Sequence, residues 1–266
     1  MTSLQICGGG KMGEALLGGI LSSGFIEPGA VSVVEKLPER REELKRRFPG
    51  VTVLAEVDAC ESALLAVKPN DVAAACRSLG ACRPARVLSV AAGITTRQLE
   101  SWLSDGSWRA HVVRSMPNTP ALVGAGIAAI APGLHADGSD LEWAEQVLGA
   151  VGEVVRVTEA QLDAVTGLSG SGPAYIFLVA EALTEAGVLA GLARSVAEQL
   201  AAHTVAGAGV LLTTSGRSAG DLRADVTSPG GTTAAGLRAL EAAAVRSAFI
   251  EAVLAATARS EELGRS

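Results

Sequence analysis

Three glycines near the N-terminus have the spacing of a loop that holds a dinucleotide pyrophosphate. Gly8, Gly10 and Gly13 form GxGxxG within GGGKMG, directly after the apolar run LQIC at residues 4–7. The first glycine would make a tight turn, the second would let the backbone approach the phosphates, and the third would let a helix pack on the strand. Because the chain holds 31 glycines, such a triplet arises easily by chance, so its context decides the interpretation.

A carboxylate at the end of the next predicted strand supplies that context. The run VSVV at 31–34 predicts the strand, and Glu35 follows it. A carboxylate there can accept hydrogen bonds from the adenosine ribose hydroxyls and repel a 2′-phosphate, which favours NADH. Lys36, Arg40 and Arg41 come next and could neutralise a phosphate, or could simply form a solvated helix start. The sequence therefore predicts a bound dinucleotide and leaves the choice between NADH and NADPH open.

A second loop, VTSPGGTT at 226–233, could hold a carboxylate. Two glycines and two threonines directly before a helical stretch present free backbone N–H groups and hydroxyls. A helix N-terminus of this kind binds anions well. The same residue types are also the usual helix caps, so the residues alone favour an ordinary cap.

Short β-branched runs alternate with helical periodicity up to about residue 157. Helical patterns lie between many of the runs, for example at 14–23, 39–48 and 141–148. This alternation predicts a Rossmann-like α/β domain with a mostly parallel, doubly wound sheet. The expected strands are 4–7, 31–34, 51–54, 63–67, 86–91, 110–113, 126–131 and 153–157.

Strand patterns end after residue 158, and only helical ones follow. We expect helices at 159–166, 173–190, 194–214 and 233–263, the last broken near Leu240, with loops rich in Gly and Ser at 167–173 and 227–233. A change from α/β to all-α is a natural domain boundary. We therefore predict a dinucleotide-binding domain over residues 1–158 and a helical substrate-binding and dimerisation domain over residues 159–266.

Composition excludes some classes of function and indicates self-association. The net charge is −6, and no basic stripe with interleaved aromatics appears, which disfavours nucleic-acid binding. The helices at 173–190 and 194–214 are apolar around most of their circumference. Glu181 and Glu185 interrupt the long apolar stretch at 174–192. These helices therefore indicate an oligomer rather than a membrane protein.

The cysteines and the N-terminus point to a reducing compartment. Cys7, Cys60, Cys76 and Cys82 form no CxxC pair and share no spacing with histidine. We therefore expect buried, reduced thiols in a cytoplasmic protein, with no metal site. The first residues lack the basic and apolar pattern of a signal peptide.

Further motifs follow GGGKMG in a fixed order: AVKP (66–69), SVAAGI (89–94), RSMPNTPALVGAG (114–126), LSGSGPAY (168–175) and VTSPGGTT (226–233). Together they resemble the pyrroline-5-carboxylate reductase family over nearly the whole chain. The resemblance implies an oxidoreductase that reduces the cyclic imine 1-pyrroline-5-carboxylate to L-proline, the last step of proline biosynthesis. It also implies NADPH or NADH as cofactor and a homodimer or a larger assembly, such as a ring of five dimers.

The resemblance also assigns site residues. It implies that the second threonine of the late loop, Thr233, hydrogen-bonds the imine nitrogen as the catalytic residue, beside a carboxylate-binding group. The implied substrate-binding residues are Ser228, Gly230, Gly231, Thr232 and Thr233. The implied cofactor-binding residues are Gly8, Gly10, Lys11, Met12, Gly13, Glu35, Lys36, Ala66, Val67, Lys68, Pro69, Ala91, Ala92, Met116, Pro117 and Asn118.

Three other functions compete with this one. A β-hydroxyacid dehydrogenase has a similar layout but uses a lysine of its second domain, and this chain has no lysine beyond Lys68. A non-catalytic NAD(P)-binding sensor would not need the VTSPGGTT loop. A reductase of a related cyclic imine acid stays open, because pocket size cannot be read from sequence. Asp225 stands where some relatives carry Asn near the cofactor. Asp could still accept a hydrogen bond but would repel a 2′-phosphate, so it is left out of the site.

Overall fold

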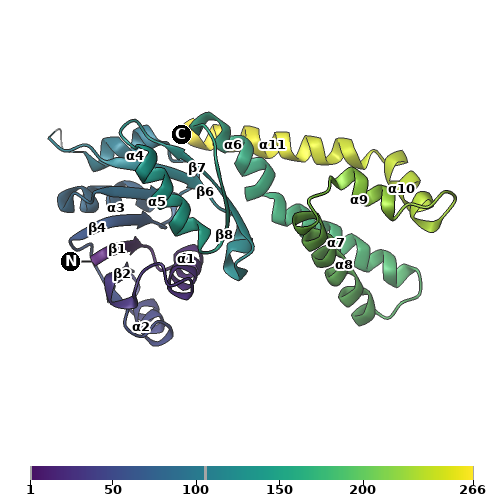
Figure 1. Cartoon of the computed structure of the whole chain (residues 1–266), viewed down its shortest axis with the longest axis horizontal. Coiled ribbons are helices and arrows are strands. Elements are labelled where there is room, and N and C mark those ends of the chain that lie inside the picture. The colour runs from purple at the N-terminus through teal and green to yellow at the C-terminus, as the bar shows by residue number, and fades with distance from the viewer. Residues whose placement is uncertain (1, 105–106, 266) are drawn as a thin grey trace. The chain divides into compact units, whose positions relative to one another are not determined.

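The eight expected strands form one sheet in the computed structural model, which describes residues 2–104 and 107–265 (Figure 1). The strand order is β3-β2-β1-β4-β5-β6-β7-β8, and the paired strands are parallel except for β6 with β7. The strands are β1 (Thr2–Cys7), β2 (Val31–Val34), β3 (Thr52–Leu54), β4 (Cys60–Leu65), β5 (Arg86–Ser89), β6 (His111–Met116), β7 (Gly126–Pro132) and β8 (Gly152–Arg156). The predicted mostly parallel sheet is confirmed. Its strand order reverses between β1 and β4, which is where ligands bind in such sheets.

Helices cover both faces of the sheet, as a doubly wound fold requires. Successive strand residues point to opposite faces, so Leu64 packs in one core and its neighbours Ala63 and Leu65 in the other. The first core includes side chains of α1 (Lys11–Ser22), α2 (Pro38–Arg47) and α5 (Gly138–Gly149). The second includes those of α3 (Pro69–Cys82) and α4 (Thr96–Leu103). Both cores are built mainly from aliphatic side chains, in keeping with the 3% aromatic content.

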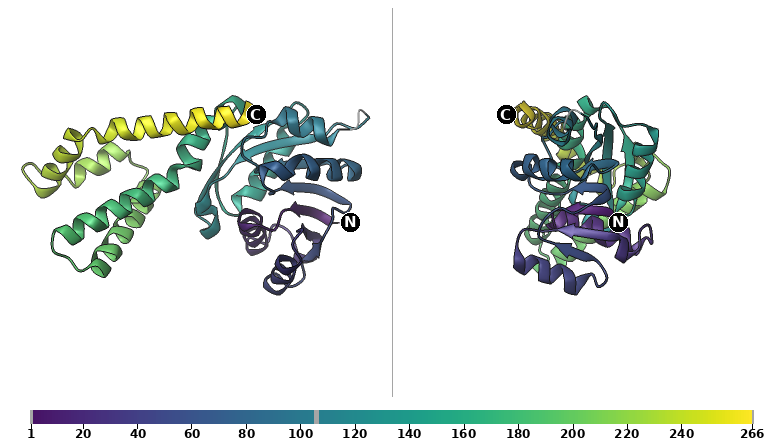
Figure 2. Two further views of the ribbon diagram at one scale, coloured as in Figure 1. Left: turned by 180° about the vertical axis from the view of Figure 1, so that it is seen from behind. Right: turned by 90° about the vertical axis from the view of Figure 1, so that its left-hand side faces the viewer.

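Two compact units divide the chain: residues Ser171–Ala255 form one, and Met1–Gly170 with Ala256–Ser266 form the other. The division does not coincide with the predicted boundary at residue 158. Two short helices, η3 (Glu159–Gln161) and α6 (Leu162–Val165), follow the last strand and remain with the sheet, because Leu162 is fully buried against Ala129 and Ala131 of β7. The end of α11 (Val245–Arg265) lies beside α6 (Figure 2), where Ser260 donates a hydrogen bond of 2.6 Å to Asp163.

The second unit is all helical, as expected. It contains α7 (Gly172–Leu189), α8 (Arg194–Thr214), α9 (Ala219–Asp225), α10 (Thr232–Ala242) and the first part of α11. The helices α7 and α8 lie side by side (Figure 1). A Cβ atom on Gly187 would come within 3.0 Å of the Ala197 side chain, so small residues allow this close packing.

Three details of the helical region differ from the sequence prediction. The expected loop at 167–173 is a π-helical turn, Thr166–Gly170, followed at once by α7. The helix α9 was not predicted; its first turn is capped by Ser218, which accepts from the Asp221 amide at 3.1 Å. The break in the last helix falls at Ala243 and Ala244 rather than at Leu240, and Ala244 adopts a φ of 55°, the conformation that commonly ends a helix.

By length and composition, the helical run Glu159–Leu189 could also cross a membrane, with a mean hydropathy of 1.3. A single such run is weak evidence, because helices that pack in soluble proteins share these properties.

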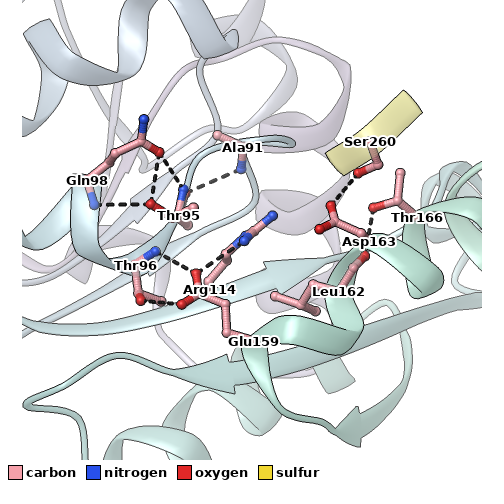
Figure 3. Close-up of polar contacts among 11 residues, drawn as sticks. Ala91, Thr95, Thr96, Gln98, Arg114, Glu159, Leu162, Asp163, Thr166 and Ser260 are labelled. Carbon is pink, nitrogen blue, oxygen red and sulfur yellow. Dashed lines mark hydrogen bonds and ion pairs between the residues drawn. The ribbon is translucent and has the colours of Figure 1, made fainter. Parts of the chain in front are cut away.

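A partly buried ion pair ties the start of α4 to the chain that follows β8 (Figure 3). The Glu159 carboxylate accepts from the Thr96 amide at 2.7 Å, from the Thr96 hydroxyl at 2.6 Å and from Arg114 Nη1 at 3.1 Å. Arg114 is only 7% exposed. Partial burial raises the pKa of Glu159, but the hydrogen bonds from Thr96 and Arg114 outweigh it and hold the pKa below its ordinary value of 4.5.

We expect Glu159→Gln to lower the free energy of unfolding by about 1–3 kcal/mol at neutral pH, because a buried guanidinium loses its charged partner. A depressed pKa stabilises the fold above the unfolded-state pKa, and this contribution is lost as the pH falls through the folded-state pKa. The free energies of unfolding of the wild type and of Glu159→Gln should therefore converge in acid. Urea unfolding at neutral and acidic pH, at one protein concentration, measures these free energies. Glu56→Gln, at an exposed glutamate, is the control. Equal stabilities at neutral pH would contradict the assignment.

Candidate active site

The glycine loop joins β1 to α1 with no room for side chains at two of its positions. Gly8 has a φ of 111°, and a Cβ there would lie 2.5 Å from the Ala66 carbonyl oxygen. A Cβ on Gly13 would lie 2.0 Å from the carbonyl oxygen of Gly8. Gly10 is the N-cap of α1 and is exposed, with open space around the position of a Cβ. The loop therefore fits a pyrophosphate, which would face exposed backbone at the positive end of a helix.

A cleft of about 290 Å³ opens at the carboxyl ends of β4, β5 and β6. Many of the residues assigned by resemblance line this cleft together, although they come from separate stretches of the chain. They are Met12, Ala66, Val67, Pro69, Ala91, Ala92, Met116, Pro117 and Asn118. Val90, Thr119 and Gly170 also line it. Sequence reasoning did not single out these three, although each lies within a quoted motif.

Asn118 is 9% exposed, and its amide is used within the protein. Its Oδ1 accepts from the Ile127 amide at 3.0 Å, and its Nδ2 donates to the Ser169 carbonyl at 3.2 Å. The side chain therefore ties the loop after β6 to β7 and to the π-helical turn. The structure thus places Asn118 in the lining of the cleft, where its polar atoms hold the wall.

Glu35 lies against the glycine loop. Its carboxylate accepts from the Gly9 amide at 3.0 Å and from the Leu37 amide at 2.9 Å. Lys36 points to a different partner, Asp71, at 2.8 Å, and its side chain is 72% exposed. Lys11 and Lys68 are also exposed and do not line the cleft. Of the charged residues assigned to the cofactor, Glu35 is the one that the structure holds in contact with the loop.

The VTSPGGTT loop belongs to the second unit. Gly230 has a φ of 72°, and a Cβ on Gly231 would lie 2.5 Å from Ser228 Oγ. Gly231 is the N-cap of α10, which has no side-chain cap in this described segment. Thr232 and Thr233 occupy the first two positions of α10, and both are exposed. The first-turn amides and two hydroxyls are thus available to an anion, so the ordinary side-chain cap considered from the residues is not what the loop forms.

Asp225 pairs with Arg217 at the end of α9, and this pairing lowers the Asp225 pKa. The carboxylate is thus engaged on the surface of the second unit, in keeping with its omission from the site.

The four cysteines are free, and three are buried as expected; Cys82 is partly exposed. Burial is the main cause that raises the pKa of Cys7, Cys60 and Cys76 to about 12. Such thiols stay protonated at neutral pH and are poor nucleophiles, and all three pack in the second core.

The histidines contribute no catalytic geometry. His111, for which the sequence named no partner, has Nδ1 2.8 Å from Oδ2 of Asp140, which also accepts from the amide of Asp137, the N-cap of α5. His203 is exposed in the middle of α8, as the sequence suggested.

Comparison with protein families places both halves of the chain. A profile described as pyrroline-5-carboxylate reductase dimerisation matches residues 159–263. A second, described as NADP oxidoreductase coenzyme F420-dependent, matches residues 3–93. The first match covers nearly the same residues as the predicted helical domain.

Individual relatives match over the whole chain. It is 44% identical to a pyrroline-5-carboxylate reductase of Mycobacterium tuberculosis, over 99% of this chain and 97% of that protein. It is 39% identical to the one of Corynebacterium melassecola, over all of both chains. The solved structure of a pyrroline-5-carboxylate reductase from Coxiella burnetii has a TM-score of 0.92 at 35% identity, covering 100% of this chain and 99% of that one. The Plasmodium falciparum pyrroline carboxylate reductase with NADP bound has a TM-score of 0.82 at 26% identity, covering 99% and 98%.

These full-length likenesses confirm the resemblance that the ordered motifs indicated. The chain belongs to the pyrroline-5-carboxylate reductase family.

Proposed function

We propose that this chain reduces 1-pyrroline-5-carboxylate to L-proline with NADPH or NADH. The observation that carries the proposal is full-length family membership, in a chain that keeps both the glycine loop and the VTSPGGTT loop. A non-catalytic NAD(P)-binding protein would need only the first of these. No lysine follows Lys68, so lysine-dependent dehydrogenase chemistry has no donor in the helical region.

The cleft supports a mechanism based on positioning. A reduced nicotinamide, when bound, supplies the hydride that adds to the C=N carbon of the imine. The imine nitrogen, protonated beforehand, becomes the secondary amine of proline, so no strong acid is needed from the protein. Ala66, Ala91 and Ala92 line the cleft with short side chains, which allow two reactants to approach closely.

The carboxylate of the substrate fits the start of α10. The first-turn amides carry partial positive charge and lack acceptors within the helix. We assign the carboxylate to Ser228, Gly230, Gly231 and Thr232, and the imine nitrogen to the hydroxyl of Thr233. Both threonine side chains are exposed, so neither hydroxyl has to leave a buried position to reach a ligand.

We expect Thr233→Ala to lower kcat at least about tenfold, because one hydrogen bond that orients the imine is lost in the transition state. Cofactor affinity should stay unchanged, since Thr233 lies outside the sheet unit that carries the glycine loop. Steady-state oxidation of NADH and NADPH with pyrroline-5-carboxylate measures kcat. Calorimetric titration of the cofactor measures its affinity.

Thr52→Ala is the matched control, because Thr52 is an exposed residue of β3. Unchanged turnover in Thr233→Ala would remove Thr233 from the mechanism. Cofactor binding by the wild-type chain without any oxidation would favour the sensor, and turnover only with a larger cyclic imine acid would favour the related reductase.

We further propose that the chain works as a homodimer or a larger assembly in the cytoplasm, and that it binds neither membranes nor nucleic acid. The described helices of the second unit expose many large apolar side chains, among them Phe177 (64% exposed), Leu178 (64%), Ile250 (60%) and Leu254 (63%). A second copy of this unit would bury such faces, and the profile match describes this region as a dimerisation region. Glu181 and Glu185 lie within α7, and Glu185 pairs with Arg194, which suits a protein partner better than lipid.

We expect light scattering at micromolar concentration to give the mass of at least two chains. Phe177→Glu should shift the particle toward the monomer, because a charge would be buried at the interface. Leu134→Glu, at a side chain 79% exposed in the sheet unit, should leave the mass unchanged. A wild-type monomer would contradict the proposed assembly.

A further inference from the structure

The carboxylate of Glu35 approaches the glycine loop because of an unassigned glycine. A Cβ on Gly9 would come within 2.5 Å of Leu44 Cδ1 and 3.2 Å of Glu35 Oε2. With no side chain there, the Gly9 amide donates directly to Oε2 at 3.0 Å, and the Leu37 amide holds Oε1 at 2.9 Å. Two backbone contacts therefore fix the carboxylate at the end of β2, beside the turn that would hold the pyrophosphate.

This fixed carboxylate keeps free capacity to bind a ligand. A carboxylate offers about four acceptor positions, two on each oxygen. Within the described chain, each Glu35 oxygen accepts one hydrogen bond. The remaining positions suit the two hydroxyls of an unphosphorylated ribose, which donate hydrogen bonds. A phosphate on the 2′ oxygen would replace a donor with a group that carries a charge of about −1.5 to −2.

The cations that could offset such a charge are already engaged. Arg40 donates to the Gly9 carbonyl at 2.8 Å and pairs with both Glu14 and Glu43. Its side chain is only 19% exposed, so its geometry is held by its neighbours.

The two flanking cations are also engaged. Lys36 pairs with Asp71 at 2.8 Å. Arg41 Nη1 donates to the carbonyls of Glu35 and Lys36 at 2.9 and 2.8 Å. Of these three cations, Arg41 is thus the one that is tied to carbonyls rather than to a carboxylate, and it is the residue that a 2′-phosphate would have to recruit.

We propose that Glu35 makes this chain select NADH over NADPH, an inference that rests on the proposed reductase function. The carboxylate, fixed by the Gly9 and Leu37 amides, accepts from the ribose hydroxyls of NADH and repels the 2′-phosphate of NADPH. The sequence left the choice between NADH and NADPH open, because Glu35 favours the first and the basic residues after it could favour the second. In the structure, those basic residues bind groups at the start of α2 and link it to α1 and α3.

The test is calorimetric titration of the full-length chain with NADH and with NADPH, and separately with 5′-AMP and 2′,5′-ADP. We expect NADH to bind at least about tenfold more tightly than NADPH, and 5′-AMP more tightly than 2′,5′-ADP. Glu35→Gln keeps the size of the side chain and removes its charge, so it should reduce the ratio of the two affinities about tenfold. The wild-type ratio decides the question even where this variant fails to fold.

Two further variants separate the roles of nearby charges. Glu39→Gln removes an exposed carboxylate from the first turn of α2 and should change the ratio less than about twofold, because exposed charges are screened. Arg41→Ala should affect NADH and NADPH equally. A selective loss of NADPH binding in Arg41→Ala would show that Arg41 clamps a 2′-phosphate and would overturn the proposal.

The outcomes keep the two proposals apart. If neither dinucleotide binds, the proposed reductase function fails and the inference fails with it. If both bind and NADPH binds as tightly as NADH or more tightly, the reductase function stands and the assignment to Glu35 is wrong.

Discussion

The cleft at the carboxyl ends of β4, β5 and β6 depends on the close approach of Gly13 to Gly8. A Cβ at Gly13 would lie 2.0 Å from the Gly8 carbonyl oxygen, and one at Gly8 would lie 2.5 Å from that of Ala66. These contacts bring the start of α1 against the ends of β1 and β4 at the point where the strand order reverses. Only with backbone packed on backbone can the exposed N-terminus of α1 face the cleft at this edge of the sheet.

The walls of the cleft are held by hydrogen bonds that two polar side chains make within the protein. The Asn118 amide holds the loop after β6, and Glu159 holds the start of α4, to which the loop carrying Ala91 and Ala92 leads. Both side chains direct their polar atoms to partners within the protein itself. The lining can therefore be largely apolar, because the polar atoms of Asn118 and Glu159 hold its position through hydrogen bonds to the protein itself. Arg114, almost fully buried beside Glu159, makes this arrangement costly to disturb because its charge has little access to water.

The sequence predicted the order of strands and helices because local patterns determine them: alternating β-branched runs for the sheet and apolar periodicity for the long helices. It also grouped the cleft residues, through the fixed order of the motifs. It did not reveal Glu159, whose partner Thr96 is 63 residues away, or the pairing of His111 with Asp140, since such contacts exist only after folding. The helix α9 was missed because a short polar helix has little hydrophobic periodicity to detect. The compact units differed from the predicted domains because helices after β8 still pack on the sheet through Leu162.

The charges after β2 show the limit of reading a site from residue types. In the sequence, one glutamate is followed by three cations, and their sum suggests tolerance of a phosphate. In the structure these charges do not simply add. Arg40 forms ion pairs with Glu14 and Glu43, and Lys36 forms one with Asp71. A largely buried, paired cation such as Arg40 offers little to an incoming anion, since binding the anion would require giving up partners already in place. Glu35 accepts from two amides that carry no net charge, and no ion pair to it is found among the described residues. At the end of β2, Glu35 is therefore an acidic group that two backbone amides orient without an ion pair.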